Sequence, residues 1–363
     1  MTRRSDSVTI RDVAKHAAVS VATVSRFMNS KSQVSQELSE RIQQVMMDLN
    51  YQPHAAARHL ATHQTHTIGL ILHNVHSDFF SPLLSGIESV VNENQYNLLV
   101  ATYKSPARSD SMPQIGAHNT DGILVFADSL SEEHLTLLCR NNFPLVLIHR
   151  TPPANLKIPF VTVENKAATR ELIDHLIEKH NRRTIVFLQG PHEQEDSHWR
   201  EQGYREALES HGIPFNASLL MDGDFSSQVA YENIKSYLNQ NFPPKFDAIF
   251  TGNDYAAMGV LTALKEAGLR VPEDVAVVGF DDSRLSPFLN PPLTTVRAPT
   301  EAVGRTAAQL LFDQIKAQPA EFVILLPTEI VIRQSCGCLH EAATPPEIIP
   351  FAGGELLRIN TLP

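Results

Sequence analysis

Residues 20–29 read Ser-Val-Ala-Thr-Val-Ser-Arg-Phe-Met-Asn, and residues 9–17 before them read Thr-Ile-Arg-Asp-Val-Ala-Lys-His-Ala. Thr9 suits the N-cap of a first helix, and Asp12 holds the acidic position of a capping box three residues later. Ser20 is a good N-cap for a second short helix. Two short helices joined by a tight turn predict a helix-turn-helix.

The second helix separates into an inner and an outer face. Its spacing points Val24 and Phe27 inward. The outer residues are small, hydroxyl-bearing or basic, which suits a helix that enters a DNA groove. They are Val21, Ala22, Ser25, Arg26 and Asn29. Thr9 and Thr23 join Ser25 and Asn29 as candidates for phosphate or base-edge contacts.

A third helix is expected after Ser35, and its apolar face covers the first two helices. Pro53 ends that region, and the Ala-rich segment 54–62 has high helix propensity but is too short to be stable alone. A marginally stable helix that lies between two domains can act as a conformational switch, because it can form or unfold.

The distribution of charge supports a nucleic-acid partner for the N-terminal part. The whole chain carries a net charge of −10. Residues 1–62 contain eight Lys and Arg against five Asp and Glu, a net +3, and the remainder contains 22 against 35, a net −13. An excess of +3 is small, so the helical pattern carries more weight than the charge.

The order of motifs resembles the headpiece and hinge of the lac repressor (LacI/GalR) family of bacterial transcription regulators. The matching residues run from Thr9 through Val-Ser-Val-Ala-Thr-Val-Ser-Arg to Leu-Asn-Tyr-Gln-Pro and Ala-Arg-His-Leu. The Val21-Ala22 pair is similar to that of the galactose repressor, which implies similar half-sites. The resemblance also implies that Leu60 is a wedge in the minor groove at the operator centre. Ala18 replaces the family's usual Gly, which should be tolerated if its φ is negative.

The composition is that of an ordinary globular protein. At 363 residues the chain is long enough for two or three domains, and three Cys fit a reducing compartment rather than a disulfide scaffold. No membrane span or signal peptide is evident, so we expect a cytoplasmic protein without a membrane partner.

Beyond Thr67, runs that alternate strand and helix predict parallel sheets with helices on both faces. The resemblance implies two Rossmann-like lobes of periplasmic-binding-protein type. The expected division is a headpiece (1–52), a hinge and linker (53–65), a core (66–342) and a tail (343–363) without a coiled-coil heptad. Within the core, lobe 1 takes about 66–163 and 297–322, and lobe 2 takes about 164–296 and 323–342. Pro106, Pro113 and Gly116 argue for a short or broken helix between residues 103 and 120.

Ligands of open α/β sheets bind at the carboxyl ends of strands. Polar and aromatic residues that suit a sugar follow five strand ends, where aromatics stack on the ring and polar groups bond its hydroxyls. These effector candidates are Asn74, Phe79, Phe80, Asp196, Arg200, Phe225, Asn253 and Asp281. The family match carries over Arg200 (Arg-x-x-Gly-aromatic), Asn253 (Gly-Asn-Asp), Asp281 and Phe225. Any one of them alone would more often be a cap or a surface residue.

Other classes of function are less well supported. The sequence shows no phosphate loop, catalytic metal spacing or nucleophile motif, so no enzyme and no cofactor are expected. Cys336-Gly-Cys338 lacks further ligands apart from His340 nearby in sequence, and no metal site is assigned. A stand-alone sugar-binding protein is the rival class, disfavoured by the N-terminal helices and the missing signal peptide.

The sequence therefore predicts a homodimeric repressor of carbohydrate-use genes. It binds a pseudo-palindromic operator, with Arg26 as a bidentate guanine contact. A small-molecule effector controls it, a sugar in the first place and a nucleobase or sugar phosphate as the alternative. Whether the ligand releases or strengthens DNA binding does not follow from the residues.

Overall fold

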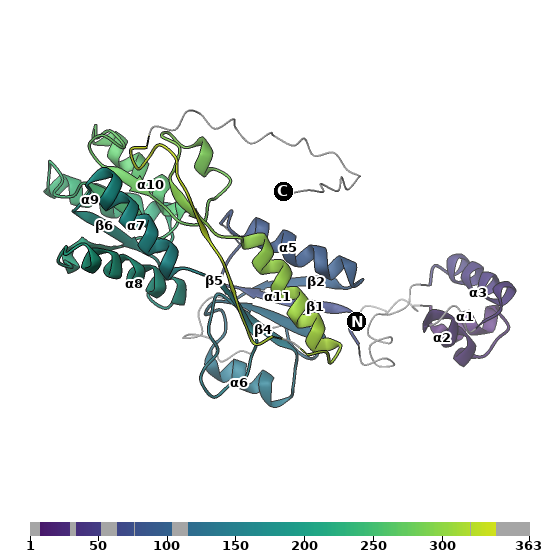
Figure 1. Ribbon diagram of the computed structural model, residues 1–363. Helices are drawn as coiled ribbons and strands as arrows, with labels where there is room; N and C mark the ends of the chain where they lie inside the picture. Colours follow the sequence, from purple (N-terminus) through teal and green to yellow (C-terminus); the bar gives the residue numbers. More distant parts are fainter. Residues whose placement is uncertain are drawn as a thin grey trace, which may run out of the picture. The chain divides into compact units, whose positions relative to one another are not determined.

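The computed structural model describes residues 8–29, 34–51, 64–75, 77–103, 115–319 and 321–338. The chain divides into two compact units, residues 1–65 and 66–363, which are taken separately below (Figure 1). The hinge segment 54–62, most of the stretch 103–120 and the tail 343–363 lie outside the described residues.

The described residues of the first unit form a headpiece of three helices. Its helices are α1 (Ile10–His16), α2 (Val21–Asn29) and α3 (Gln36–Asp48). The Asp12 carboxylate accepts hydrogen bonds from the backbone N–H of Thr9 at 2.8 Å and from its hydroxyl at 2.7 Å. The Ser20 hydroxyl accepts one from the backbone N–H of Thr23 at 3.1 Å. Both predicted helix starts are therefore confirmed, and α1 packs on α2 around Val13, Val24, Phe27 and Ile42 of α3.

The turn between α1 and α2 holds Ala18 at φ 50°, in the left-handed region. A negative φ was the condition under which Ala in place of Gly would be tolerated, and Ala18 does not meet it. The chain has to reverse direction within a few residues, and the backbone N–H of Val19 bonds the carbonyl of Ala14 at 3.0 Å to close the turn. A Cβ in this conformation costs about 1–2 kcal/mol, which the usual Gly would avoid.

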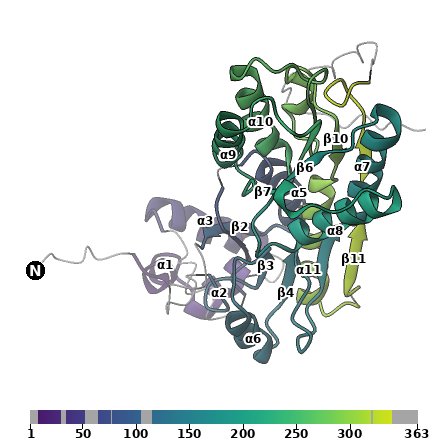
Figure 2. The same ribbon diagram turned by 90° about the vertical axis from the view of Figure 1, so that its left-hand side faces the viewer.

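The core's first lobe is a six-stranded parallel sheet in the order β11-β5-β4-β3-β1-β2. Its strands are β1 (Thr67–Leu72), β2 (Asn97–Thr102), β3 (Gly122–Phe126), β4 (Leu145–Ile148), β5 (Phe160–Val163) and β11 (Val323–Leu326). Helices α5 (Phe80–Glu93) and α11 (Thr300–Ile315) cover one face, and α6 (Glu132–Arg140) lies on the other (Figures 1 and 2). Alternating side chains of β1 supply both faces, which is why this strand reads as an unbroken apolar run.

The second lobe has a four-stranded parallel sheet in the order β7-β6-β8-β9. The strands are β6 (Ile185–Gln189), β7 (Leu220–Asp222), β8 (Ala248–Thr251) and β9 (Ala276–Val278). The helices are α7 (Lys166–His180), α8 (Glu195–Ser210), α9 (Ser227–Gln240) and α10 (Asp254–Glu266). The predicted α/β architecture of parallel sheets with flanking helices is confirmed.

The chain crosses between the lobes after β5 and again through β10 (Thr295–Arg297) and β12 (Glu329–Val331), which pair antiparallel. Strand β11 pairs with β5 from Val323↔Phe160 to Leu326↔Val163, so it belongs to the first lobe. The expected assignment of residues 323–326 to the second lobe is wrong. Without β11, β5 would be the edge strand of the first-lobe sheet. Strand β11 pairs in parallel with this edge before the chain crosses back to the second lobe.

Neighbouring helices approach each other closely where a glycine replaces a side chain. A Cβ on Gly86 of α5 would lie 2.0 Å from the Glu301 carbonyl oxygen of α11. A Cβ on Gly203 of α8 would lie 2.3 Å from the Lys166 carbonyl oxygen of α7. The close contact at Gly203 sets the position of α8 relative to α7. Helix α8 carries two of the candidate effector residues, Asp196 and Arg200.

Candidate functional site

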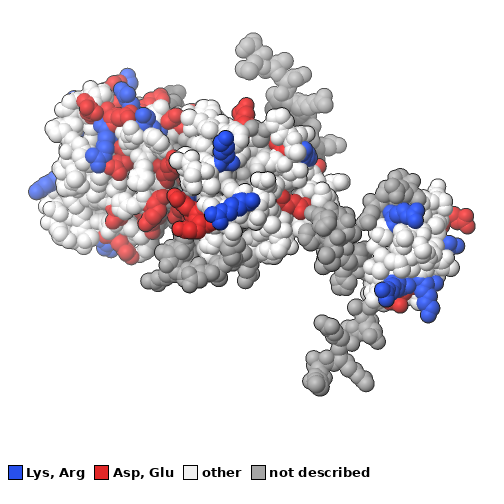
Figure 3. All heavy atoms as spheres, turned by 90° about the horizontal axis from the view of Figure 1, so that it is seen from below, with Lys and Arg blue, Asp and Glu red and all other residues white. Residues whose placement is uncertain are grey.

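The recognition surface of the headpiece is the exposed side of α2. Val21 has 41% of its surface exposed, and Ala22 and Arg26 are also exposed. Val24 and Phe27 are buried, as predicted. The small unit shows several Lys and Arg side chains in Figure 3, in keeping with its net positive charge. This is the arrangement that a groove-entering helix needs.

The remaining DNA-contact candidates have mixed surroundings. Thr23 and Ser25 are half-buried, and the Thr23 hydroxyl lies 2.9 Å from the Ser20 hydroxyl. Thr9 is bonded to Asp12. The side chain of Asn29 and the whole of Leu60 lie outside the described residues.

The first lobe contributes an aromatic wall at the carboxyl ends of its strands. Phe79 lies edge-on to Phe126 and His149, with ring centroids 5.8 and 5.9 Å away. His149 follows β4 and is buried, and Phe126 ends β3. Phe80 packs on Phe126 and is only 6% exposed, so it belongs to the core of this lobe rather than to a ligand surface.

The second lobe contributes a buried guanidinium. Arg200 on α8 is 3% exposed, and its Nε donates to Asn165 Oδ1 at 2.8 Å. Its Nη1 donates to the carbonyl oxygen of Gly252. Its Nη2 lies 3.8 Å from Asp196 Oδ2 and 3.7 Å from Asp281 Oδ1. One cation thus holds together α8, the first crossover and the loops after β8 and β9.

Aromatic rings of the second lobe enclose the same guanidinium. Its Cζ lies 3.7 Å from the Phe280 ring centroid and 5.4 Å from that of Phe225, which are cation–π distances. The Phe225 ring occupies the space that a Cβ on Gly190 or Gly252 would need. The two glycines therefore let Phe225 lie directly on the loops after β6 and β8.

Contacts across the cleft join the two lobes on one side of Arg200. His149 Nδ1 lies 2.8 Å from Asp196 Oδ2. The Glu195 carboxylate accepts from the backbone N–H and the hydroxyl of Thr151, both at 2.6 Å. Opening the cleft would break these polar contacts, so they stabilise a closed arrangement.

The two carboxyl groups beside Arg200 differ in their ionisation. Burial on its own raises the pKa of Asp196, but His149, Arg200 and a bond from Asn165 outweigh it and leave this pKa below its ordinary value. Burial raises the pKa of Asp281 to about 8, against the opposing effect of Arg200. At neutral pH Asp196 is charged and Asp281 holds a proton, so the pair offers both an acceptor and a donor.

A cavity of about 500 Å³ lies between the lobes beside this network. Phe79 and Pro82 line it from the first lobe, and Asn253 and Asp281 line it from the second. Phe225 and Asp281 have positive φ angles of 49° and 110°, which non-glycine residues rarely adopt. Backbone strain of this kind is held at ligand sites by the surrounding structure.

The structure brings most of the predicted effector residues together. Asp196, Phe225 and Asp281 surround the guanidinium of Arg200, and Phe79 lines the adjoining cavity together with Asp281. Asn253 caps α10 by accepting from the backbone N–H of Ala256 at 2.8 Å, and Asn74 is half-buried after β1. Sequence reasoning missed Asn165, His149 and Phe280, because each follows a strand without a motif of its own.

The headpiece and much of the core both match known families. Residues 9–54 match the family of bacterial regulatory proteins, lacI family, and residues 173–336 match the periplasmic binding protein-like domain. Catabolite control protein A of Priestia megaterium is 32% identical over 335 residues, which are 91% of this chain and 99% of the relative. The chain belongs to the LacI family.

Further similarities extend over nearly the whole regulator. The transcriptional repressor CytR of Escherichia coli (strain K12) is 31% identical over 340 residues, covering 93% of this chain and 98% of CytR. The lac repressor dimer bound to operator and the anti-inducer ONPF has a TM-score of 0.77 at 27% identity, covering 91% and 99%. A CelR–cellobiose complex has a TM-score of 0.66 at 29% identity, covering 90% and 99%.

The family assignment makes this chain a DNA-binding transcriptional regulator with a small-molecule-binding core. Its relatives are transcriptional regulators and not enzymes. Among the described residues, no helix has the length and apolar character that crossing a membrane requires.

Proposed function

We propose that this regulator is a cytoplasmic, homodimeric repressor of carbohydrate-use genes whose effector is a neutral sugar bound between the core lobes. The observation that carries the proposal is the charge balance around Arg200. Two carboxyl groups lie within 4 Å of a single buried guanidinium, the Phe225 ring lies 5.4 Å from its Cζ, and Phe79 lines the adjoining cavity together with Asp281. Such a site offers hydrogen-bond donors, acceptors and apolar faces together, which is the chemistry of a sugar ring.

The same balance argues against a charged effector. Arg200 is already paired with the ionised Asp196, so its own positive charge is not free to neutralise a phosphate. A sugar phosphate would add negative charge beside Asp196. The ribose operon repressor of Halalkalibacterium halodurans, 32% identical over 330 residues, and the CelR–cellobiose complex carry sugars in their names, which supports a sugar here too.

At the operator, two copies of α2 enter successive major grooves of a pseudo-palindrome. Exposed Arg26 makes a bidentate contact to guanine, and Val21 and Ala22 select by shape or by a thymine methyl. The dimer places these helices one helical turn apart. In vitro selection of bound DNA should return a two-fold symmetric site, and Arg26→Ala should relax one base position by about 1–3 kcal/mol. A site without symmetry would contradict the dimeric repressor.

The effector is tested by thermal shift with sugars, sugar phosphates and nucleobases. We expect a neutral sugar to raise the melting temperature of the core and to change operator affinity. Stabilisation by a purine and by no sugar would replace the sugar with a nucleobase effector.

The role of Arg200 is tested by Arg200→Lys. A Lys cannot reproduce the forked contacts to Asn165 and Gly252, so the effector concentration for half response should rise about tenfold or more. Operator affinity without ligand should stay unchanged. Arg205→Lys on the same helix, exposed and paired with Glu201, is the matched control. A wild-type response in Arg200→Lys would show that the effector does not use this residue.

A further inference from the structure

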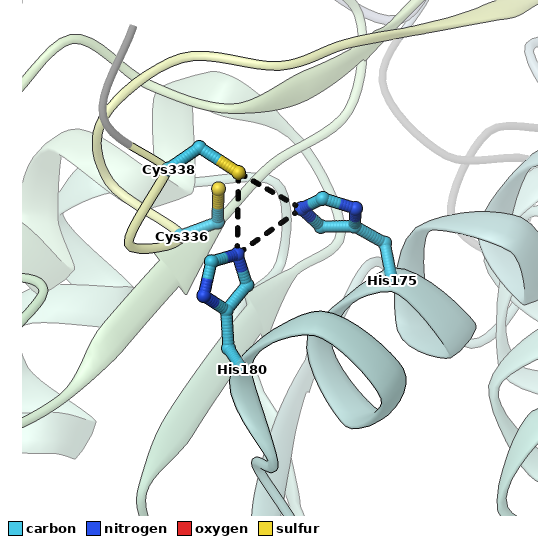
Figure 4. A group of neighbouring side chains, drawn as sticks. All are labelled: His175, His180, Cys336 and Cys338. Atoms are coloured by element: carbon cyan, nitrogen blue, oxygen red, sulfur yellow. Dashed lines mark hydrogen bonds between the residues drawn. The ribbon is translucent and has the colours of Figure 1, made fainter.

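Four side chains with metal-binding atoms meet at the far end of the second lobe. His175 and His180 come from the last turns of α7, and Cys336 and Cys338 come from the turn after β12 (Figure 4). Their ligating atoms all lie within 4.8 Å of one another. Figure 4 shows both rings directed at the Cys338 sulfur, with the Cys336 sulfur beside it.

The three distances among His175, His180 and Cys338 match those of a tetrahedral zinc site, and the Cys336 sulfur lies within 4.8 Å of the other ligand atoms. With Zn–N near 2.05 Å and Zn–S near 2.3 Å, tetrahedral angles separate two nitrogens by about 3.3 Å and a nitrogen from a sulfur by about 3.5 Å. His175 Nε2 and His180 Nε2 are 3.3 Å apart. Cys338 Sγ lies 3.5 Å from His175 Nε2 and 3.3 Å from His180 Nε2.

We propose that His175, His180, Cys336 and Cys338 bind one Zn²⁺ in a Cys₂His₂ site that fastens the end of the core to α7. Two thiolates and two imidazoles form a closed structural set that satisfies zinc without a water ligand. Soft sulfur ligands disfavour magnesium and calcium. The site lies outside the effector cleft, and it does not depend on the proposed sugar.

The surrounding backbone holds the ligands in place before any metal binds. Gly337 between the two cysteines has φ 114°, and a Cβ there would lie 2.9 Å from His180 Nδ1. Ser335 anchors the turn on the second lobe, because its carbonyl accepts from the Val277 N–H at 2.9 Å and its hydroxyl from the Thr294 N–H at 2.8 Å. The Thr294 hydroxyl donates to Cys336 Sγ at 3.2 Å. Little reorganisation is needed for binding.

His175, His180 and Cys338 are uncharged at pH 7 in the metal-free protein. Burial lowers the pKa of both His175 and His180, so their rings are neutral at pH 7 and offer lone pairs. Burial raises the pKa of the Cys338 thiol to about 11 in the metal-free protein, and the neighbouring Cys336 adds to this. Zinc binding therefore releases a thiol proton, and apparent affinity rises with pH.

Cobalt and zinc are the probes for this site in the full-length, reduced protein. We expect about one Zn²⁺ per chain by elemental analysis. Co²⁺ loaded into the metal-depleted protein should give the intense visible bands of a tetrahedral ion and a thiolate charge-transfer band. Cys338→Ser and His180→Gln should each lose these signals. Cys139→Ser and His192→Gln, which change the third cysteine and an exposed histidine, should keep them.

Stability gives a second readout. A chelator should lower the melting temperature of the wild type and of Cys139→Ser, but not that of Cys338→Ser, because only a protein that binds zinc gains from it. Circular dichroism checks that each variant is folded. A wild type that takes up no tetrahedral Co²⁺ would overturn the proposal, as would equal uptake by Cys338→Ser. A thiol count showing one free cysteine in place of three would replace the zinc site with a Cys336–Cys338 disulfide.

Discussion

Gly203→Ala tests how helix packing positions the buried guanidinium. Gly203 lies on α8, three residues after Arg200, and its missing Cβ lets α8 touch α7. An added Cβ would lie 2.3 Å from the Lys166 carbonyl oxygen and 3.0 Å from Thr169 Cβ. Ordinary contact begins at 3.4 Å, so the helices would have to separate by about 1.1 Å. The obstructing atom is backbone, which cannot move as a flexible side chain can.

The sign of the change in the free energy of unfolding shows whether Gly203 is required for helix packing. Overpacking of this kind costs about 3 kcal/mol at the upper end of its usual range. Ala gains about 1 kcal/mol over Gly in a helix interior. We therefore expect the free energy of unfolding to fall by about 2 kcal/mol. If Gly203 had no packing role, the variant would instead be more stable by about 1 kcal/mol.

The functional change follows from the same displacement. Moving α8 by about 1 Å stretches the 2.8 Å bond from Arg200 Nε to Asn165 beyond hydrogen-bonding range. Effector affinity should therefore fall even where the variant remains folded. Urea denaturation gives the stability, calorimetric titration gives the affinity, and exposed Glu209→Ala on the same helix is the control. A Gly203→Ala variant that is at least as stable as wild type and binds effector equally well would refute this reasoning.

Three further predictions follow from the described residues and the hinge. Asp281 has its pKa raised to about 8 in the fold but ionises near 3.8 when unfolded, so the fold holds an extra proton between these values. The free energy of unfolding should therefore fall as pH rises from about 4 to about 8, by up to about 1.4 kcal/mol per pH unit. Urea denaturation at several pH values measures this slope, and Asp281→Asn should flatten it. An unchanged slope in the variant would count against the raised pKa. Ala18→Gly should remove the backbone strain of the left-handed turn and stabilise the headpiece by about 1 kcal/mol, which would slow amide hydrogen exchange in α1 and α2. Faster exchange in the variant would show that the turn is not strained. Leu60→Ala should reduce operator affinity and DNA bending with little change in melting temperature if Leu60 is the minor-groove wedge, whereas a loss of about 2–5 kcal/mol in stability with unchanged bending would make it a core residue.

The sequence by itself determined the headpiece helices, the alternation of strands and helices in the core, and the class of the protein. The caps at Thr9 and Ser20 and the spacing of Val24 and Phe27 defined the headpiece, because capping and helical periodicity are local properties of the chain. The apolar run at residues 122–126 indicated β3, since a strand buried on both faces leaves an unbroken signal. The resemblance to the family, through the Arg-x-x-Gly-aromatic motif, made Arg200 a candidate for effector binding.

Tertiary structure decided what depends on residues far apart in the chain. Only folding brings Asn165 and His149 to Arg200 and Asp196, and only the pairing of β11 with β5 assigns residues 323–326 to the first lobe. Cys338 and His180 lie 158 residues apart, and no local pattern around either one indicates the other. The φ of Ala18 likewise follows from closing α1 onto α2, because a short turn takes whatever backbone conformation the packing of its two helices requires.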